Sequence, residues 1–415
     1  MGPLAGGTEP HAALLRRALA ALCATEIVSY GVLYYAFPVL AGDITASTGW
    51  PRTAVIAAFS AGNLTGAATG ILAGRLIDRH GPRPVMTAGS VLATVAVAAI
   101  AMAPGYGWFM AAWVVAGVAM AGVFYPPAFA ALTGWYGPGR VRALTTLTLA
   151  AGFASTIFAP LTATLAGHLS WRGVYLVLAV VLAAVTIPAH ALALRRPWPS
   201  QHRDRTAPGG LARRVLVSRT FLVLATSMTL SAFALYAVVF NLVPLLTGRG
   251  LSPSLAAWAL GLGGAGQVAG RLCYGSLAAH TGVRGRALGV MAAGAGTIFL
   301  LAVLPGPAAL LIAVAVLTGA VRGLFTLLEA TAVSDHWGPA GYASLNGVFN
   351  APLTAATALA PTIGAAVAGA AGDQALFVIL AGTSALSAVL VLATRLPAQR
   401  LAEAEVSPGP LSPSG

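Results

Sequence analysis

The sequence has 415 residues, of which 58% are apolar and 8% are charged. A soluble fold does not easily reach this balance, so the composition indicates a protein of the lipid bilayer. The formal charge of +13 comes from arginine without any lysine. Because these arginines follow the two sides of a membrane and do not cluster on a soluble surface, we expect no nucleic-acid partner.

Twelve long apolar runs follow one another along the chain. They lie near 18–41, 53–74, 84–103, 108–133, 143–167, 172–194, 219–247, 254–276, 286–304, 307–332, 342–369 and 373–395. Each is long enough to cross the hydrocarbon core as an α-helix. The first run follows Arg16 and Arg17 directly and is too long for the core of a signal peptide, so we expect it to remain as the first span. The sequence therefore predicts an all-α membrane protein with twelve transmembrane helices.

Arginine is distributed unevenly over the two sides of this predicted bundle. If both termini are cytoplasmic, the inner loops and tails hold 18 arginines and the outer loops hold three, at Arg52, Arg172 and Arg249. Basic loops stay on the cytoplasmic side of a membrane. We therefore expect a multi-pass protein of the cell inner (cytoplasmic) membrane with both termini in the cytoplasm.

The apolar pattern stops for about 24 residues between the sixth and seventh runs, in a segment rich in proline and arginine. We interpret this segment, 195–218, as a cytoplasmic linker between two six-helix bundles. The bundles are expected at 1–194 and 219–395, and a cytoplasmic tail at 396–415.

The two halves repeat one another at a constant offset of 201 residues. This offset carries Gly74 to Gly275 and Arg83 to Arg284, and it also holds in a distant region, where Gly137-Pro138 becomes Gly338-Pro339. Such a repeat fits two bundles related by an axis along the membrane normal, with a central cavity where they meet.

The loop between the second and third runs reads Gly-Arg-Leu-Ile-Asp-Arg-His-Gly-Pro-Arg. Its residues Gly74, Asp78, Arg79, Gly81 and Arg83 match the G-x-L-x-D-R-x-G-x-R pattern, so the loop resembles the corresponding loop of the major facilitator superfamily of transporters. The resemblance implies two pseudo-symmetric six-helix bundles. We expect these five residues to form a conformational latch, because a carboxylate among arginines can make and break a charge-assisted contact with a neighbouring helix end.

Four acidic or arginine side chains lie well inside predicted spans, where burial of a charge is costly: Glu26, Arg271, Arg322 and Glu329. Glu329 follows Arg322 by two helical turns on the same face. Each of the four is a candidate for function. The alternative is that Arg322 and Glu329 belong to a structural charge network and that Arg271 extends to the cytoplasmic interface.

The segment from Gln267 to Gly275 resembles the eighth span of the monocarboxylate transporter and oxalate/formate antiporter families, in which an arginine stands four residues before a glycine. The resemblance implies that Arg271 engages the carboxylate of the substrate, and the fork of the guanidinium group suits two oxygens. Gln267 stands where animal members of these families carry an acid.

These features predict a secondary active transporter that moves a small organic anion, a monocarboxylate, by alternating access. We assign substrate binding to Arg271 and Arg322, because a carboxylate relieves the cost of a buried guanidinium group, and add Tyr34 and Asn350 as polar neighbours. Either Glu26 or Glu329 takes up a proton if transport is symport. Anion exchange and both directions of transport remain open.

Other classes of function are disfavoured by the sequence. It contains no nucleophile with a base, no metal cluster and no phosphate loop, so we expect neither catalysis nor a cofactor or metal. The alternative is a proton-coupled exporter of drugs or other small molecules in the same superfamily. Such exporters share a Gly-Pro-x-x-Gly-Gly element in the fifth span, where this chain reads Ala-Pro-Leu-Thr-Ala-Thr at 159–164. We expect the protein to act as a monomer.

Overall fold

The computed structural model describes residues 8–198, 214–339 and 341–394, and within these ranges all regular structure is helical. Most of the expected linker, at 199–213, and the expected tail lie outside the described residues. The structure thus has the predicted all-α class.

The first half of the molecule extends from α1 to η3. Its elements are α1 (Thr8–Tyr30), η1 (Gly31–Tyr35), α2 (Ala36–Thr48), α3 (Arg52–His80), α4 (Pro82–Ala101), α5 (Tyr106–Val123), α6 (Tyr125–Tyr136), η2 (Gly137–Gly139), α7 (Arg140–Ala166), α8 (Trp171–Pro188) and η3 (Ala189–Ala193). The segments α1, η1 and α2 form one continuous rod, as do α8 and η3. With α5 and α6 taken as one broken rod, this half contains six rods.

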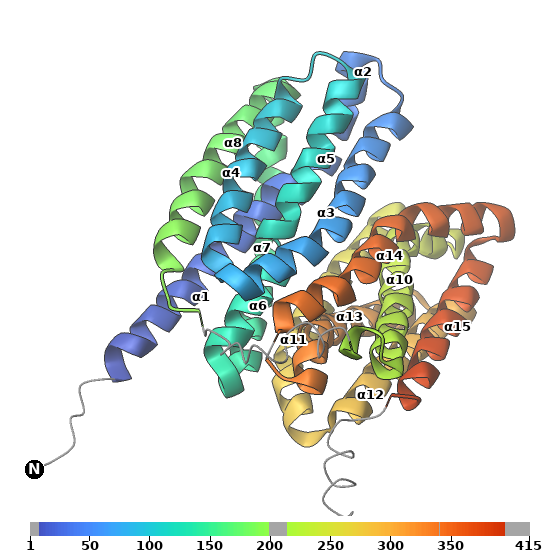
Figure 1. The fold of residues 1–415 in the computed structure, drawn as a ribbon. Coiled ribbons are helices and arrows are strands. Elements are labelled where there is room, and N and C mark those ends of the chain that lie inside the picture. The colour runs from blue at the N-terminus through green and yellow to red at the C-terminus, as the bar shows by residue number, and fades with distance from the viewer. Residues whose placement is uncertain (1–7, 199–213, 340, 395–415) are drawn as a thin grey trace, which may run out of the picture.

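The second half extends from α10 to α15. Its six helices are α10 (Arg219–Gly248), α11 (Pro253–His280), α12 (Val283–Val303), α13 (Ala308–Trp337), α14 (Tyr342–Ala371) and α15 (Asp373–Leu392). The two sets of helices occupy separate parts of the molecule and meet along α3 and α14 (Figure 1).

Ten stretches of the described chain are long and apolar enough to cross a membrane. One of them, at 106–166, contains two successive rods, α5–α6 and α7, whereas α11 is not among the ten. Several glycines and Arg271 make α11 polar for a membrane span. The helix that carries the principal candidate for substrate binding is therefore also one that hydropathy alone identifies poorly.

Prolines interrupt two rods of the first half, close to Tyr34, Tyr35 and Tyr125. Phe124 is extended between α5 and α6, because the prolines at 126 and 127 suit the first turn of a new helix but not the interior of a continuous one. In the first rod, Pro38 lacks an N–H group and follows the π-helical turn η1. The break places Tyr125 at the start of α6, and the widened turn carries Tyr34 and Tyr35.

Glycine allows the closest helix contacts in both halves. A side chain at Gly117 on α5 would overlap the backbone of Gly62 on α3, and one at Gly319 on α13 would overlap Gly263 on α11. Gly62 and Gly263 are 201 residues apart. Small residues permit such approach where no hydrophobic effect drives helices together.

The repeat extends to individual hydrogen bonds. Arg83 Nε donates to the carbonyl of Ala191 at 2.9 Å, and Arg284 Nη2 donates to the carbonyl of Leu392. Donors and acceptors are each 201 residues apart, so the two halves form equivalent contacts between their third and sixth rods. This arrangement is the pseudo-symmetry that the sequence offset predicts.

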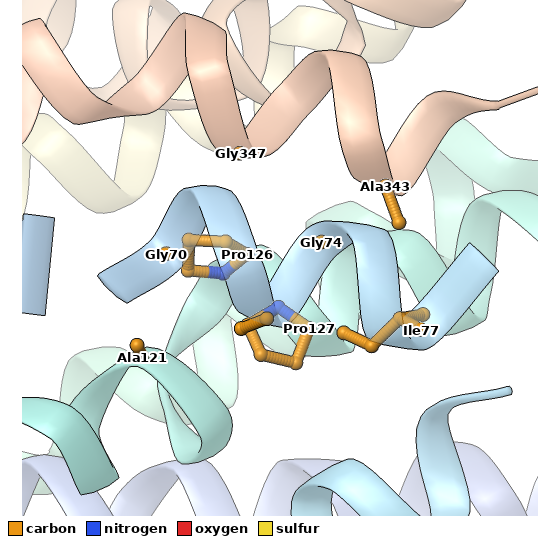
Figure 2. Close-up of a pocket in the computed structure, with 9 residues that line it drawn as sticks. Gly70, Gly74, Ile77, Ala121, Pro126, Pro127, Ala343 and Gly347 are labelled. Carbon is orange, nitrogen blue, oxygen red and sulfur yellow. The ribbon is translucent and has the colours of Figure 1, made fainter. Parts of the chain in front are cut away.

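The halves contact each other toward one end of the helices. Gly74 on α3 lies directly against the carbonyl of Ala343 on α14, and a side chain at Gly347 would lie 2.6 Å from the carbonyl of Gly70. We call this end, where α3 ends and α14 begins, the closed end. Figure 2 shows a small cavity beside this contact, lined by residues of α3, α5, α6 and α14. Its lining consists of glycine, alanine, proline and isoleucine, so it offers no polar side chain to a ligand.

The contact between α3 and α5 gives a test of the glycine packing. We expect Gly117→Ala to destabilise the protein by about 1–3 kcal/mol, because the added methyl group has no space against Gly62. Thermal unfolding of the detergent-solubilised protein measures the loss. Gly107→Ala in the same helix meets no atom within 4 Å and is the matched control. Equal melting temperatures for the two variants would contradict the packing described here.

Candidate functional site

Asp78 connects the two halves at the closed end. Its Oδ2 accepts a hydrogen bond of 2.7 Å from the backbone N–H of Ser344, and its Oδ1 accepts one of 3.2 Å from Ala343. These N–H groups belong to the first turn of α14, where helical partners are absent and the helix dipole is positive. The carboxylate thus contacts a helix end of the other half, and its use as a latch remains a prediction.

The other four residues of this motif have different environments. Gly74 permits the approach to α14. Gly81 joins α3 to α4 with a φ of +79°, a conformation that favours glycine. Arg83 holds η3 within the first half, and Arg79 is exposed. In this motif, Asp78 and Gly74 therefore contact the other half, whereas Gly81 and Arg83 shape the loop and its packing within the first half.

A second polar contact between the halves involves a residue that the sequence does not single out. Asp335 accepts from Arg140 Nη2 at 2.7 Å and from Arg286 Nη2 at 2.6 Å. Arg140 begins α7 in the first half, whereas Asp335 and Arg286 belong to the second. The expected tenth span ended at residue 332, but α13 continues to Trp337 and carries Asp335 in its last turn. The sequence shows this acid but does not indicate which arginines it meets.

Arg271 lies on α11 and its side chain turns toward the first half. It is 6% exposed, and its Nη1 donates to the backbone carbonyl of Thr148 on α7 at 2.5 Å. Its Nε is buried without a hydrogen-bond partner among the described residues. Arg271 therefore does not extend along its own helix to the interface, which was the alternative considered from sequence.

Arg322 lies on α13 and has a different partner. Its Nη2 donates to Oε1 of Gln267 at 3.0 Å. Close glycine contacts make this possible, because Gly270 sits against Ala320 and Gly323 against the backbone of Gln267. The structure thus brings Arg271 and Arg322 together, near enough to interact electrostatically.

Three tyrosines accompany the two guanidinium groups. Tyr35 on η1 and Tyr236 on α10 each interact electrostatically with both Arg271 and Arg322, and Tyr125 at the start of α6 interacts with Arg271. Phenol groups from both halves therefore lie near the arginine pair. These tyrosines also lie in the expected spans, but the sequence gives no reason to prefer them over Tyr34.

Tyr34 and Asn350 have less direct relations to the arginines. The Tyr34 ring packs edge-on against Tyr35 with 5.3 Å between centroids. Asn350 is buried, and its Nδ2 donates to the carbonyl of Asn346 at 3.1 Å. Neither side chain forms a hydrogen bond with Arg271 or Arg322 within the described residues, so their assignment to substrate binding remains a prediction.

The two buried acids lie in different halves. Glu26 on α1 has no exposed surface, and its two carboxyl oxygens have no hydrogen-bond partner in the described part of the chain. It interacts electrostatically with Tyr30 and Tyr125. Glu329 on α13 is partly exposed and interacts with Tyr236. Glu329 thus interacts electrostatically with a tyrosine that also interacts in this way with both arginines.

A buried histidine joins three rods of the first half. His190 in η3 lies 2.8 Å from Ser90 Oγ through Nδ1 and 3.0 Å from Thr25 Oγ1 through Nε2. The side chain has no exposed surface. The sequence analysis does not select His190, because no other histidine or acid accompanies it. Its position within an apolar run, two residues after a proline, nevertheless indicates a buried polar side chain.

The sequence matches the family model described as Major Facilitator Superfamily over residues 22–307 and 222–414. It is 30% identical over 326 residues to an uncharacterized 38 kDa protein in a 23S RNA operon of Thermoproteus tenax, covering 78% of this chain and 80% of that protein. It is also 29% identical over 267 residues to human monocarboxylate transporter 11, covering 62% of this chain and 55% of that protein.

Solved structures share the fold. The crystal structure of FucP in the outward conformation has a TM-score of 0.70 at 16% identity, covering 91% of this chain and 98% of FucP. The human organic anion transporter MFSD10 has a TM-score of 0.68 at 17% identity, covering 92% of this chain and 100% of MFSD10. The family match spans most of the chain and the helices have the same arrangement, so this multi-pass membrane protein belongs to the Major Facilitator Superfamily of secondary transporters.

Proposed function

We propose that the protein moves a small organic anion, a monocarboxylate, across the cytoplasmic membrane by alternating access. The observation that carries this proposal is the pair Arg271 and Arg322, two guanidinium groups that lie close together and form no ion pair with a carboxylate of the described residues. The name of the human relative, monocarboxylate transporter 11, supports the same class of substrate.

The proposal follows from the cost of burying charge. A guanidinium group in a low-dielectric site is unfavourable unless an anion and hydrogen-bond acceptors compensate it. A substrate carboxylate supplies both, and its two oxygens match the donor fork of an arginine. The hydroxyl groups of Tyr35 and Tyr236 supply further donors for its remaining lone pairs.

Glu329 is the better candidate for proton coupling in this proposal. Tyr236 interacts electrostatically with Glu329 and with both arginines, so a change of charge at Glu329 acts on the anion site. Glu26 is linked electrostatically to Arg271 through Tyr125, whereas Tyr236 links Glu329 to both arginines. We therefore assign the proton to Glu329.

The arginine distribution gives the orientation in this proposal. With basic loops inside, the closed end faces the cytoplasm and the structure is outward-facing. Asp78 then holds the cytoplasmic side closed through the first turn of α14. A contact of this kind sets the resting population, and the substrate shifts it by its differential affinity for the two states.

Substitution of the arginines tests the substrate class. In proteoliposome counter-flow with carboxylates, we expect Arg271→Lys and Arg322→Lys to raise the KM about tenfold or more, because a charge-assisted hydrogen bond is worth about 1.5–3 kcal/mol. Arg172→Lys is the control, since Arg172 caps the backbone of Ala103 in a loop. Normal transport by both site variants, or a wild type that moves only cations or neutral amphiphiles, would overturn the anion assignment and favour an exporter.

Removal of the Asp78 charge tests the latch. Asp78→Asn keeps the shape but replaces one acceptor by a donor, so we expect slower transport with near-normal membrane levels. The measurement is the initial rate of uptake, normalised to the amount of protein in the membrane. Asp43→Asn alters an exposed acid on α2 and is the matched control. If Asp78→Asn transported at the wild-type rate, the latch would have no support.

Substitution of Glu329 tests proton coupling. In Glu329→Gln we expect uptake driven by a pH gradient to fall to the level seen without a gradient, while exchange of one carboxylate for another continues. Glu26→Gln carries the same chemical change in the first half and should retain the response to pH. The opposite result, with only Glu26→Gln losing the response, would transfer the coupling role to Glu26.

A further inference from the structure

Arg271 forms a hydrogen bond between the halves, and its acceptor is an uncharged backbone oxygen. Nη1 donates to the carbonyl of Thr148 at 2.5 Å, two turns from the start of α7 and toward the closed end. This group is also the proposed ligand of the substrate carboxylate. A carboxylate that took the donor fork containing Nη1 would therefore compete with Thr148 for this nitrogen.

The missing side chain of Gly152 allows this contact. Gly152 lies one turn after Thr148 on α7, and a Cβ atom built there would be 3.3 Å from Arg271 Nη1 and would meet no other atom within 4 Å. The residue is exposed toward open space. A methyl group at this position would require the guanidinium group to shift by a few tenths of an ångström and would meet no other atom within 4 Å.

The backbone of Arg271 is held firmly by α13. Gly270 sits against Ala320, and a Cβ atom at Gly323 would lie 3.1 Å from the backbone nitrogen of Arg271. Such close packing leaves little room for α11 to move relative to α13. Within the second half, a change of partner at Arg271 therefore involves rotation of its side chain and not a shift of α11 against α13.

We propose that Arg271 alternates between the Thr148 carbonyl and the substrate carboxylate, and that Gly152 is the positioning residue that makes the first arrangement possible. The inference rests on the proposed function for its substrate class. A carboxylate displaces a neutral carbonyl because charge-assisted hydrogen bonds are shorter and about twice as strong. Anion binding then removes a hydrogen bond that holds the closed end together.

This competition has a consequence for transport. The empty protein retains the Arg271 to Thr148 bond, whereas the loaded protein has lost it, so the substrate favours the change of state by its differential interaction. Exchange of one anion for another then proceeds faster than net transport, because net transport requires the empty protein to break the bond without compensation.

Gly152→Ala tests the cross-half bond without any substrate. Spin labels at His168→Cys and Ala371→Cys, both exposed residues at the end opposite the closed end, report the separation of the halves after Cys23 and Cys273 are replaced by serine. In proteoliposomes without substrate, we expect Gly152→Ala to shift the population toward the shorter distance by about tenfold, the factor that corresponds to about 1.4 kcal/mol. Gly264→Ala on α11 meets no atom within 4 Å and should match the wild type.

A second measurement concerns the anion, with radiolabelled pyruvate, lactate and acetate as probes. We expect the ratio of exchange to net uptake to fall in Gly152→Ala, and pyruvate to shift the label distance in the wild type but little in the variant. A distance distribution in Gly152→Ala equal to that of Gly264→Ala overturns the inference while the proposed function stands. If the wild type transports none of the three probes, both the proposed function and the claim that a carboxylate competes with Thr148 are overturned.

Discussion

A buried guanidinium group must find acceptors, and this requirement determines the arrangement around Arg271. The glycine contacts between α11 and α13 bring Arg271 and Arg322 together in the absence of a described carboxylate partner. Arg322 uses the amide of Gln267 and Arg271 uses the Thr148 carbonyl of the other half. Neutral acceptors compensate a cation incompletely in low dielectric. This is the basis on which we propose an anion site here, and the hydrogen bond of Arg271 to Thr148 also joins the two halves.

Among the described residues, three polar contacts connect the halves toward the closed end, and they differ in the groups that form them. Asp78 binds the first turn of α14, Asp335 binds Arg140, and Arg271 binds Thr148. The first two involve fixed charges of the protein. Only the third uses a group that we also assign to the substrate, so it is the one through which binding can act on the state of the protein. In the proposed transport cycle, the remaining two set how far the resting population favours this state.

Much of the fold could be predicted from the sequence. Hydropathy and arginine sidedness can be judged for one helix or loop at a time, and the 201-residue offset relates the two halves directly. The contact of Asp78 with a helix end also has a local cause, since a carboxylate suits a helix N-terminus. The partners Thr148 and Asp335 were not predictable in this way, because they depend on which rotamers meet across two halves. The prolines at 126 and 127 indicate the helix break before them. The break is not visible in the hydropathy, because the apolar run continues through it. The roles of Tyr34, Asn350 and the acids stay predictions.

The central claim is that a carboxylate replaces the Thr148 carbonyl as the partner of Arg271. A cryo-electron-microscopy structure of the full chain in lipid nanodiscs, with a saturating monocarboxylate, tests it most directly. We expect anion density within hydrogen-bond distance of the Arg271 guanidinium group, with that group turned away from Thr148. Anion density elsewhere in the protein, with the bond between Arg271 and Thr148 intact, would contradict the account.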